Sequence, residues 1–176
     1  EASIHLEVLG NSMEGKMFEW TLRDPEGVLV LQERGQVNDL FTTTFILDKP
    51  ELWWTHDHGE PSLYSSRLLL LDEGGKVLDV KEQKIGFRRI RLVMHEGAWS
   101  KPDTFPKGRS NPPITLELNG RRIFGKGSNW VNPDIFPGTL TRDRYDELLE
   151  MGLQINFNIF RIWGGGIVNK EAFYDA

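Results

Sequence analysis

The sequence predicts a mainly β fold, with a β-sandwich in the first half of the chain and a βαβα unit in the second. Residues 1–95 alternate apolar and polar side chains over short stretches separated by turn residues. A spacing of roughly 8–12 residues between such stretches is typical of a sandwich. In residues 114–176, a stretch with the periodicity of a helix instead lies between two apolar stretches. That order is typical of a parallel sheet or barrel.

Short stretches with the two-residue period of a half-buried strand make up the first half. Turn residues such as Asp24-Pro25-Glu26-Gly27 and Gly74-Gly75 separate several of them. The last stretch is expected to close the sandwich. The predicted strands cover residues 4–8, 18–22, 28–31, 41–47, 64–71, 77–80 and 90–94.

Proline and glycine crowd residues 96–113, which are predicted to link the two domains. A hairpin over residues 114–124 is expected next. Residues 123–124 are predicted to be the first parallel strand, and residues 157–162 the second. Because residues 114–176 hold only two βα units, they cannot close an eight-stranded barrel by themselves.

The helix between these strands has clear signals. Thr141 is a predicted N-cap, and Asp143 falls in the first turn, where the helix dipole favours a negative charge. Asn169 is predicted to cap a second helix. The expected buried face of the first helix consists of Tyr145, Leu148, Leu149 and Leu153.

Composition excludes several classes of function. The chain has 176 residues, a net charge of −5, no cysteine, and acidic and basic residues mixed along its length. A nucleic-acid partner, a membrane span, disulfides and thiolate metal sites are therefore not expected, and no targeting segment is apparent. Because the chain starts at Glu1 without a signal-like stretch, we expect it to begin inside a longer protein.

Arg161 is the most informative residue for function. A guanidinium within an apolar parallel strand needs an ion-pair partner, or it lies at the carboxyl end of the strand and faces a site. Both interpretations stay open. Asn129 and Trp130 end the neighbouring stretch, and βα loops at such ends build the active sites of barrels. For Trp130, covering the rim of the barrel is the structural alternative.

Three other motifs have weaker functional interpretations. The glycines of Gly164-Gly165-Gly166 allow a tight turn and close approach of a ligand, but the spacing does not complete a dinucleotide fingerprint. His56-Asp57-His58 resembles a metal cluster, although Asp57 is expected to point away in an extended segment, and no metal or other cofactor is predicted. The nearby carboxylates offer no convincing pair for general acid and nucleophile: Asp134, Asp143 and Asp146.

The chain resembles glycoside hydrolase family 2, in the form of its β-mannosidase branch. Asn156-Phe-Asn-Ile-Phe-Arg-Ile-Trp-Gly-Gly-Gly166 resembles the second barrel strand of that branch, and Lys126-Gly-Ser-Asn-Trp-Val131 resembles its first. Glu51-Leu-Trp-Trp54 and Ile85-Gly-Phe-Arg88 are similar to segments of its middle sandwich domain. Leu118-Asn-Gly120 resembles the lead-in to the barrel, so the likeness runs along nearly the whole chain in order.

The resemblance implies an immunoglobulin-like β-sandwich joined to a truncated opening of a (β/α)8 barrel. It implies that Arg161 keeps the nucleophilic glutamate ionised and that Trp163 walls the sugar subsite. Asn129 and Trp130 would line the same pocket. Both catalytic glutamates would lie beyond Ala176, so no catalytic residue is expected within this chain.

Three residues depart from the pattern of the branch. Asn132 and Thr55 stand where proline is usual, and Gly125 stands where a strand usually has an apolar side chain. Gly125 is expected to weaken the first parallel strand by roughly 0.5–1 kcal/mol relative to alanine.

The sequence thus predicts a fragment of a retaining exo-glycosidase that acts on terminal β-linked sugars, above all β-mannosides. A non-catalytic carbohydrate-binding or scaffolding module is the alternative, as is a β-galactosidase or exo-β-glucosaminidase of the same family. A carbohydrate is the expected partner. The unpaired edge of the second parallel strand also predicts self-association through residues 114–176.

Overall fold

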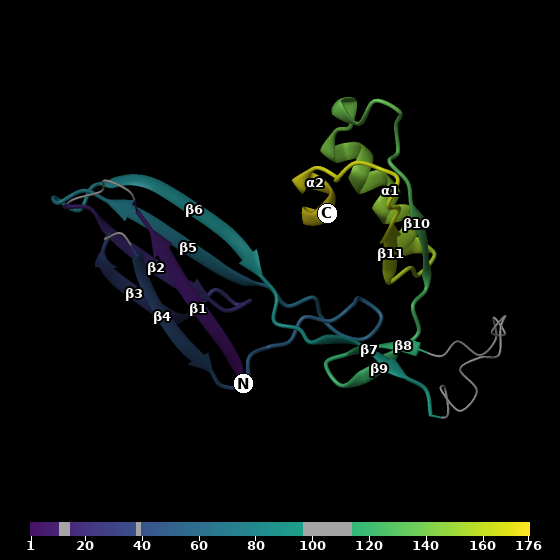
Figure 1. Cartoon of the computed structure of the whole chain (residues 1–176), viewed down its shortest axis with the longest axis horizontal. Coiled ribbons are helices and arrows are strands. Elements are labelled where there is room, and N and C mark those ends of the chain that lie inside the picture. Colours follow the sequence, from purple (N-terminus) through teal and green to yellow (C-terminus); the bar gives the residue numbers. More distant parts are fainter. Residues whose placement is uncertain (11–14, 38–39, 97–113) are drawn as a thin grey trace. The chain divides into compact units, whose positions relative to one another are not determined.

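The computed structural model describes residues 1–10, 15–37, 40–96 and 114–176 (Figure 1). The chain forms two compact units, Glu1–Arg88 and Arg89–Ala176. The first unit contains β1 (Ala2–Leu9), β2 (Met17–Arg23), β3 (Leu29–Gln36), β4 (Leu40–Leu47), β5 (Tyr64–Leu71) and β6 (Val77–Ile85). The second contains β7 (Ile90–Met94), β8 (Ile114–Leu118), β9 (Arg121–Ile123), β10 (Gly127–Trp130), the 3-10 turn η1 (Pro137–Thr139), α1 (Arg142–Gln154), β11 (Ile159–Ile162) and α2 (Glu171–Asp175).

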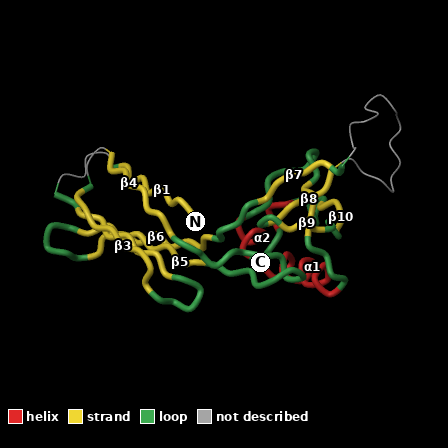
Figure 2. Tube along the Cα trace, turned by 90° about the horizontal axis from the view of Figure 1, so that it is seen from below, coloured by secondary structure: helices red, strands yellow, loops and turns green. Residues whose placement is uncertain are grey.

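The first unit is the predicted β-sandwich. Strands β1 and β4 form one sheet, which lies over the other sheet in Figure 2. The other sheet has the order β3-β2-β5-β6, and every pair in both sheets is antiparallel. Aromatic side chains of the two sheets pack against each other. The ring centroids of Phe18 and Phe41 lie 4.7 Å apart, and those of Trp20 and Phe45 lie 5.4 Å apart. Alternation of apolar residues along each strand brings these rings to one side. The core therefore lies between the two sheets.

The strand at residues 90–94 is present, but it does not close the sandwich. β7 pairs antiparallel with β8, which pairs in turn with β9. Asn119 strengthens this sheet, because its backbone N–H donates to the Arg89 carbonyl (2.8 Å) and its Oδ1 accepts from the Arg89 N–H (2.8 Å). The first unit consequently ends at Arg88, before the boundary expected at residue 95. Most of the expected linker, residues 97–113, lies outside the described residues.

The hairpin expected over residues 114–124 is formed by β8 and β9. Asn119 and Gly120 join the strands with φ angles of 51° and 82°, the left-handed conformation that a tight hairpin turn requires and that asparagine and glycine adopt most easily. The prediction that residues 123–124 form the first parallel strand is wrong, because Ile123 pairs antiparallel with Leu116. The parallel strand is β10, and Gly125 precedes it instead of weakening it.

The second unit contains the predicted βαβα order. β10 pairs parallel with β11, in register from Gly127 opposite Ile159 to Trp130 opposite Ile162. Thr141 caps α1 as predicted, since its side chain accepts from the Arg144 N–H. Tyr145 is buried, but Leu153 is 46% exposed, and the buried position on the last turn is Gly152. Among the described residues, no helix has the length and apolarity that a membrane crossing needs.

Candidate functional site

The two faces of the β10–β11 pair differ in their surroundings. Neighbouring residues of a strand point to opposite faces, so Trp130 and Asn129 cannot line the same side. Trp130 is 7% exposed and packs with Tyr145 of α1 and Phe173 of α2, at centroid distances of 6.3 and 4.6 Å. The helices therefore cover the face that carries Trp130. The open face carries Asn129 and Arg161.

Asn129 and Arg161 lie opposite each other in the parallel register. Arg161 donates from Nη1 to Oδ1 of Asn129 at 3.1 Å, and both side chains are exposed. They line an open hollow of about 320 Å³ together with Gly125, Gly127, Ser128 and Ile159. The described residues give Arg161 no carboxylate as an ion-pair partner. A cation held by a neutral amide at the end of a parallel strand is suited to attracting an anionic group.

Trp163 lies between the end of β11 and the glycine triplet Gly164-Gly165-Gly166. The Trp163 N–H donates to the Trp130 carbonyl at 2.9 Å, which extends the parallel ladder by one bond. A Cβ atom on Gly165 would lie 2.4 Å from the Trp163 ring, and one on Gly166 would lie 2.2 Å from Oδ1 of Asn132. These glycines therefore leave room for a ring and an amide of the chain itself. Trp163 is 47% exposed.

Asn169 is buried but does not cap α2, whose N-cap is Lys170. Its Oδ1 accepts from Nε1 of Trp130 at 3.2 Å, while its Nδ2 has no hydrogen-bond partner among the described residues. The prediction of a cap at Asn169 is wrong, because the indole N–H of a buried tryptophan needs an acceptor and Asn169 supplies it.

The remaining acidic candidates are accounted for by local structure. Asp134 accepts from the Phe136 N–H at 2.7 Å, and Asp146 lies 3.5 Å from Arg142 on α1. Asp143 occupies the first turn of α1. None of these contacts brings two of the carboxylates together, so they offer no acid–nucleophile pair of the kind a retaining glycosidase uses.

The His56–His58 segment forms a turn. Asp57 does not point away from His58: its Oδ1 lies 2.7 Å from Nδ1 of His58, which also contacts the Thr55 hydroxyl at 3.2 Å. A turn allows this contact where an extended segment would not. Within the described part of the chain, no three His, Cys, Asp or Glu side chains are grouped as metal ligands.

Comparison with known proteins identifies the first unit. Residues 2–88 match the family model of the glycosyl hydrolases family 2. The chain contains a family 2 glycosyl hydrolase domain. The chain is also 35% identical to a β-mannosidase of Rattus norvegicus over 124 residues, and 33% identical to β-mannosidase B of Thermothelomyces thermophilus over 135 residues. These alignments cover 70% and 77% of the chain but only 13% and 15% of the two relatives.

A likeness to a solved structure covers both units of the chain. The chain resembles the apo structure of Bacteroides uniformis β-glucuronidase 3 with a TM-score of 0.71 and 21% identity, over 98% of this chain and 19% of that one. At this identity the likeness concerns the fold alone. The chain thus spans about a seventh of the length of the curated relatives and about a fifth of this structural neighbour.

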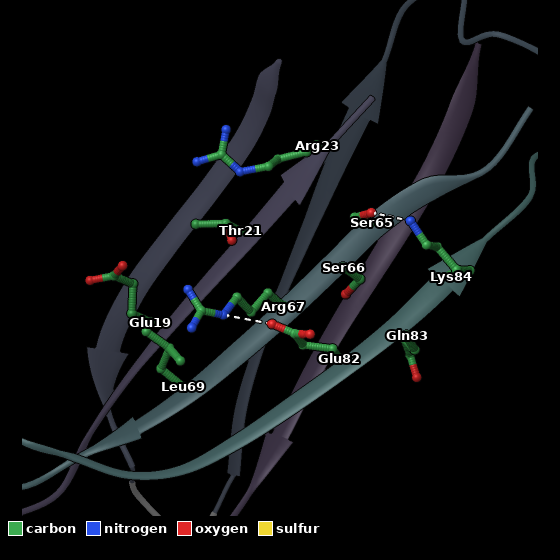
Figure 3. A pocket seen from close by; sticks show the side chains of 10 residues that line it. All are labelled: Glu19, Thr21, Arg23, Ser65, Ser66, Arg67, Leu69, Glu82, Gln83 and Lys84. Carbon is green, nitrogen blue, oxygen red and sulfur yellow. Dashed lines mark hydrogen bonds and ion pairs between the residues drawn. The ribbon is translucent and has the colours of Figure 1, made fainter. Parts of the chain in front are cut away.

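The family 2 domain has a hollow of its own on the outer face of its larger sheet. This hollow of about 510 Å³ is lined from β2, β5 and β6 (Figure 3). Its charged groups are partly engaged with neighbours, since Arg67 pairs with Glu82 at 2.9 Å and Lys84 donates to Ser65 at 2.7 Å. The ten lining residues include no aromatic ring for stacking on a sugar. The side chains that line this hollow are those expected on a solvent-exposed face of a sheet.

Proposed function

We propose that the chain is part of a retaining exo-glycosidase of family 2 whose substrates are terminal β-mannosides. The observation that carries the proposal is the Arg161–Asn129 pair, which combines a cation and an amide on the open face of two adjacent parallel strands. The identity of about a third to two β-mannosidases supports the choice of sugar. The βαβα unit would be the opening of a (β/α)8 barrel, whose active sites lie at the carboxyl ends of the strands.

Within this proposal Arg161 stabilises the nucleophile. Retaining glycosidases use one carboxylate as a nucleophile and one carboxyl group as a general acid, about 5–5.5 Å apart, and form a covalent glycosyl-enzyme. The nucleophile must be ionised, and a nearby guanidinium lowers the pKa of a carboxyl group. The carboxylates themselves would come from later strands. Asn129 would orient the guanidinium and offer its own amide N–H groups to substrate hydroxyls.

Trp163 has a different role in the proposal. Its ring is half-exposed and folded over Gly165, so it presents a flat apolar surface that suits the C–H face of a sugar. Trp130 belongs to the helix-covered core and would support the strand without touching substrate. The proposed substrate-contacting residues are therefore Asn129 and Trp163, and Arg161 acts on the nucleophile.

Kinetics of the longer protein that contains the chain test these roles. Arg161→Ala should lower kcat on a nitrophenyl β-mannoside by roughly tenfold or more, because active-site electrostatics contribute several kcal/mol. Arg142→Ala is the matched control, since Arg142 is an exposed arginine on α1. Trp163→Ala should raise KM, with Tyr174→Ala as the control for an exposed aromatic ring on α2. Unchanged kcat/KM in both active-site variants would contradict the assignment.

Substrate class is tested with a panel of nitrophenyl glycosides. The mannoside should be cleaved faster than the β-galactoside, the β-glucosaminide and the β-glucuronide. Faster cleavage of another glycoside would support the proposed glycosidase activity but contradict the proposed specificity for β-mannosides. The 176-residue chain alone should cleave none of them, because in this proposal both catalytic glutamates lie beyond Ala176. Turnover by the chain alone would mean that the catalytic residues are misassigned.

A further inference from the structure

Asn132 bridges the two loops that follow the parallel strands. It lies two residues beyond β10, and its side chain reaches the loop after β11. Its Oδ1 accepts from the Ile167 N–H at 3.1 Å, and its Nδ2 donates to the Ile167 carbonyl at 3.4 Å. The amide group therefore bonds to both polar groups of one peptide residue, as a neighbouring strand would.

The glycine loop, residues 163–167, is consequently anchored at both ends. At its start the Trp163 N–H bonds to the Trp130 carbonyl, and at its end Ile167 bonds to Asn132. Between these anchors the Gly166 N–H bonds back to the Trp163 carbonyl at 3.3 Å. The ring of Trp163 lies against Gly165 within this closed loop.

Such anchoring matters because three consecutive glycines have large conformational freedom. None of Gly164, Gly165 and Gly166 has a positive φ, so their backbone conformations do not require glycine. Gly166 instead makes space for the Asn132 amide, since a Cβ there would approach Oδ1 to 2.2 Å. Without Asn132, the loop would keep one anchor and could carry the Trp163 ring to other positions.

We propose that Asn132 is a positioning residue that fixes the glycine loop and thereby the ring of Trp163. The proposal rests on the proposed function for its consequence, since Trp163 is the substrate-facing ring there. Asn132 itself bonds to the backbone of Ile167 and acts on the sugar only through this loop. It would affect the binding of the sugar more than the chemical step, because the cation and the nucleophile lie elsewhere.

The chain offers a matched control at the other end of the same strands. Asn158 precedes β11 and makes a similar bridge to the segment before β10: its Oδ1 accepts from the Lys126 N–H at 2.8 Å, and its Nδ2 donates to the Phe124 carbonyl at 3.0 Å. Asn158→Ala removes an amide bridge without touching the glycine loop. A general loss of stability would therefore appear in both variants, and a loop-specific effect only in Asn132→Ala.

Nuclear magnetic resonance of the 176-residue chain provides the structural test. The Cα protons of Gly165 lie beside the Trp163 ring and should show an upfield ring-current shift. Asn132→Ala should reduce this shift and speed hydrogen exchange of the Ile167 amide by roughly three- to tenfold. Asn158→Ala should leave both unchanged, and Asn132→Asp, which keeps the acceptor but loses the donor, should give intermediate values. Wild-type values in Asn132→Ala would overturn the proposal.

Kinetics of the longer protein provide the functional test. Asn132→Ala should raise KM for the nitrophenyl β-mannoside severalfold with little change in kcat, and Asn132→Asp should restore part of the loss. A moved Gly165 signal with unchanged KM in an active enzyme would refute a positioning role. If the wild-type enzyme cleaved no glycoside while Asn132→Ala still moved the Gly165 signal, the proposed function would fail and the control of the loop by Asn132 would stand.

Discussion

Gly127 is the position where one added methyl group should do most damage to the candidate site. A Cβ atom built there would lie 1.7 Å from the carbonyl oxygen of Ile159 and 2.8 Å from its carbonyl carbon. Both are backbone atoms of the paired strand, so no side-chain rotation can relieve the clash. β10 would have to move from β11 by more than about 1 Å to reach ordinary contact distances, which breaks the ladder that aligns Asn129 with Arg161.

Gly127→Ala should therefore destabilise the second unit by about 3 kcal/mol or more, beyond the usual range for an overpacked site. Gly125→Ala is the control two residues earlier. Its Cβ would meet Ile159 Cγ2 and Leu116 Cδ1 at 3.5 and 3.6 Å, which are ordinary contacts, and its φ is not positive. This variant should be neutral or stabilising by roughly 0.4–1 kcal/mol. Urea unfolding followed by circular dichroism measures both. Equal midpoints for the two variants would refute the reasoning.

Three further predictions concern both units. Ser66→Ala should destabilise the sandwich by about 1–3 kcal/mol in the same unfolding assay, because it leaves the buried Trp20 indole N–H without its acceptor. The control is Ser65→Ala, which removes a half-buried hydroxyl that accepts from the exposed Lys84 side chain. It should change stability by less than about 0.5 kcal/mol, and equal effects of the two variants would contradict the prediction. Burial raises the pKa of Tyr64 above 10.0, against the opposing effect of its hydrogen bond from a backbone N–H. The unfolded chain then ionises first, so this contribution to stability is complete below about pH 10 and is lost as the pH rises through the folded pKa; Tyr64→Phe should flatten the fall in melting temperature at alkaline pH. Light scattering should find the whole chain associated through residues 114–176 and the sandwich alone monomeric; a monomeric whole chain would refute that prediction.

Local signals predicted most of the elements. Alternation located the sandwich strands, and Thr141 and Asn119-Gly120 marked a helix start and a hairpin turn that the structure contains. The pairing of strands was harder to predict, because alternation shows that residues 90–94 form a strand but does not show which sheet they join. β7 joins β8 through a pairing between residues far apart in the sequence.

The candidate site was predictable in part. The positions of Arg161 and Asn129 pointed to the carboxyl ends of strands, but their mutual contact needed the register of two strands that a helix separates. The placement of Trp130 could have been deduced, since adjacent residues in a strand face opposite sides. The role of Asn169 could not be deduced in this way. The side chain of an asparagine before a helix can cap that helix or accept a hydrogen bond from a distant group, and here the tertiary packing brings it to the Trp130 indole N–H.

The alternation along β10 and β11 has a consequence for how this segment tolerates mutation. Trp130 and Phe160 face the helices, whereas Asn129 and Arg161 face the hollow. A saturation scan should therefore separate these positions, with cellular abundance sensitive at Trp130 and Phe160 and enzyme turnover sensitive at Asn129 and Arg161. Sequences under selection for a new sugar could vary one set of positions while the other keeps the protein folded.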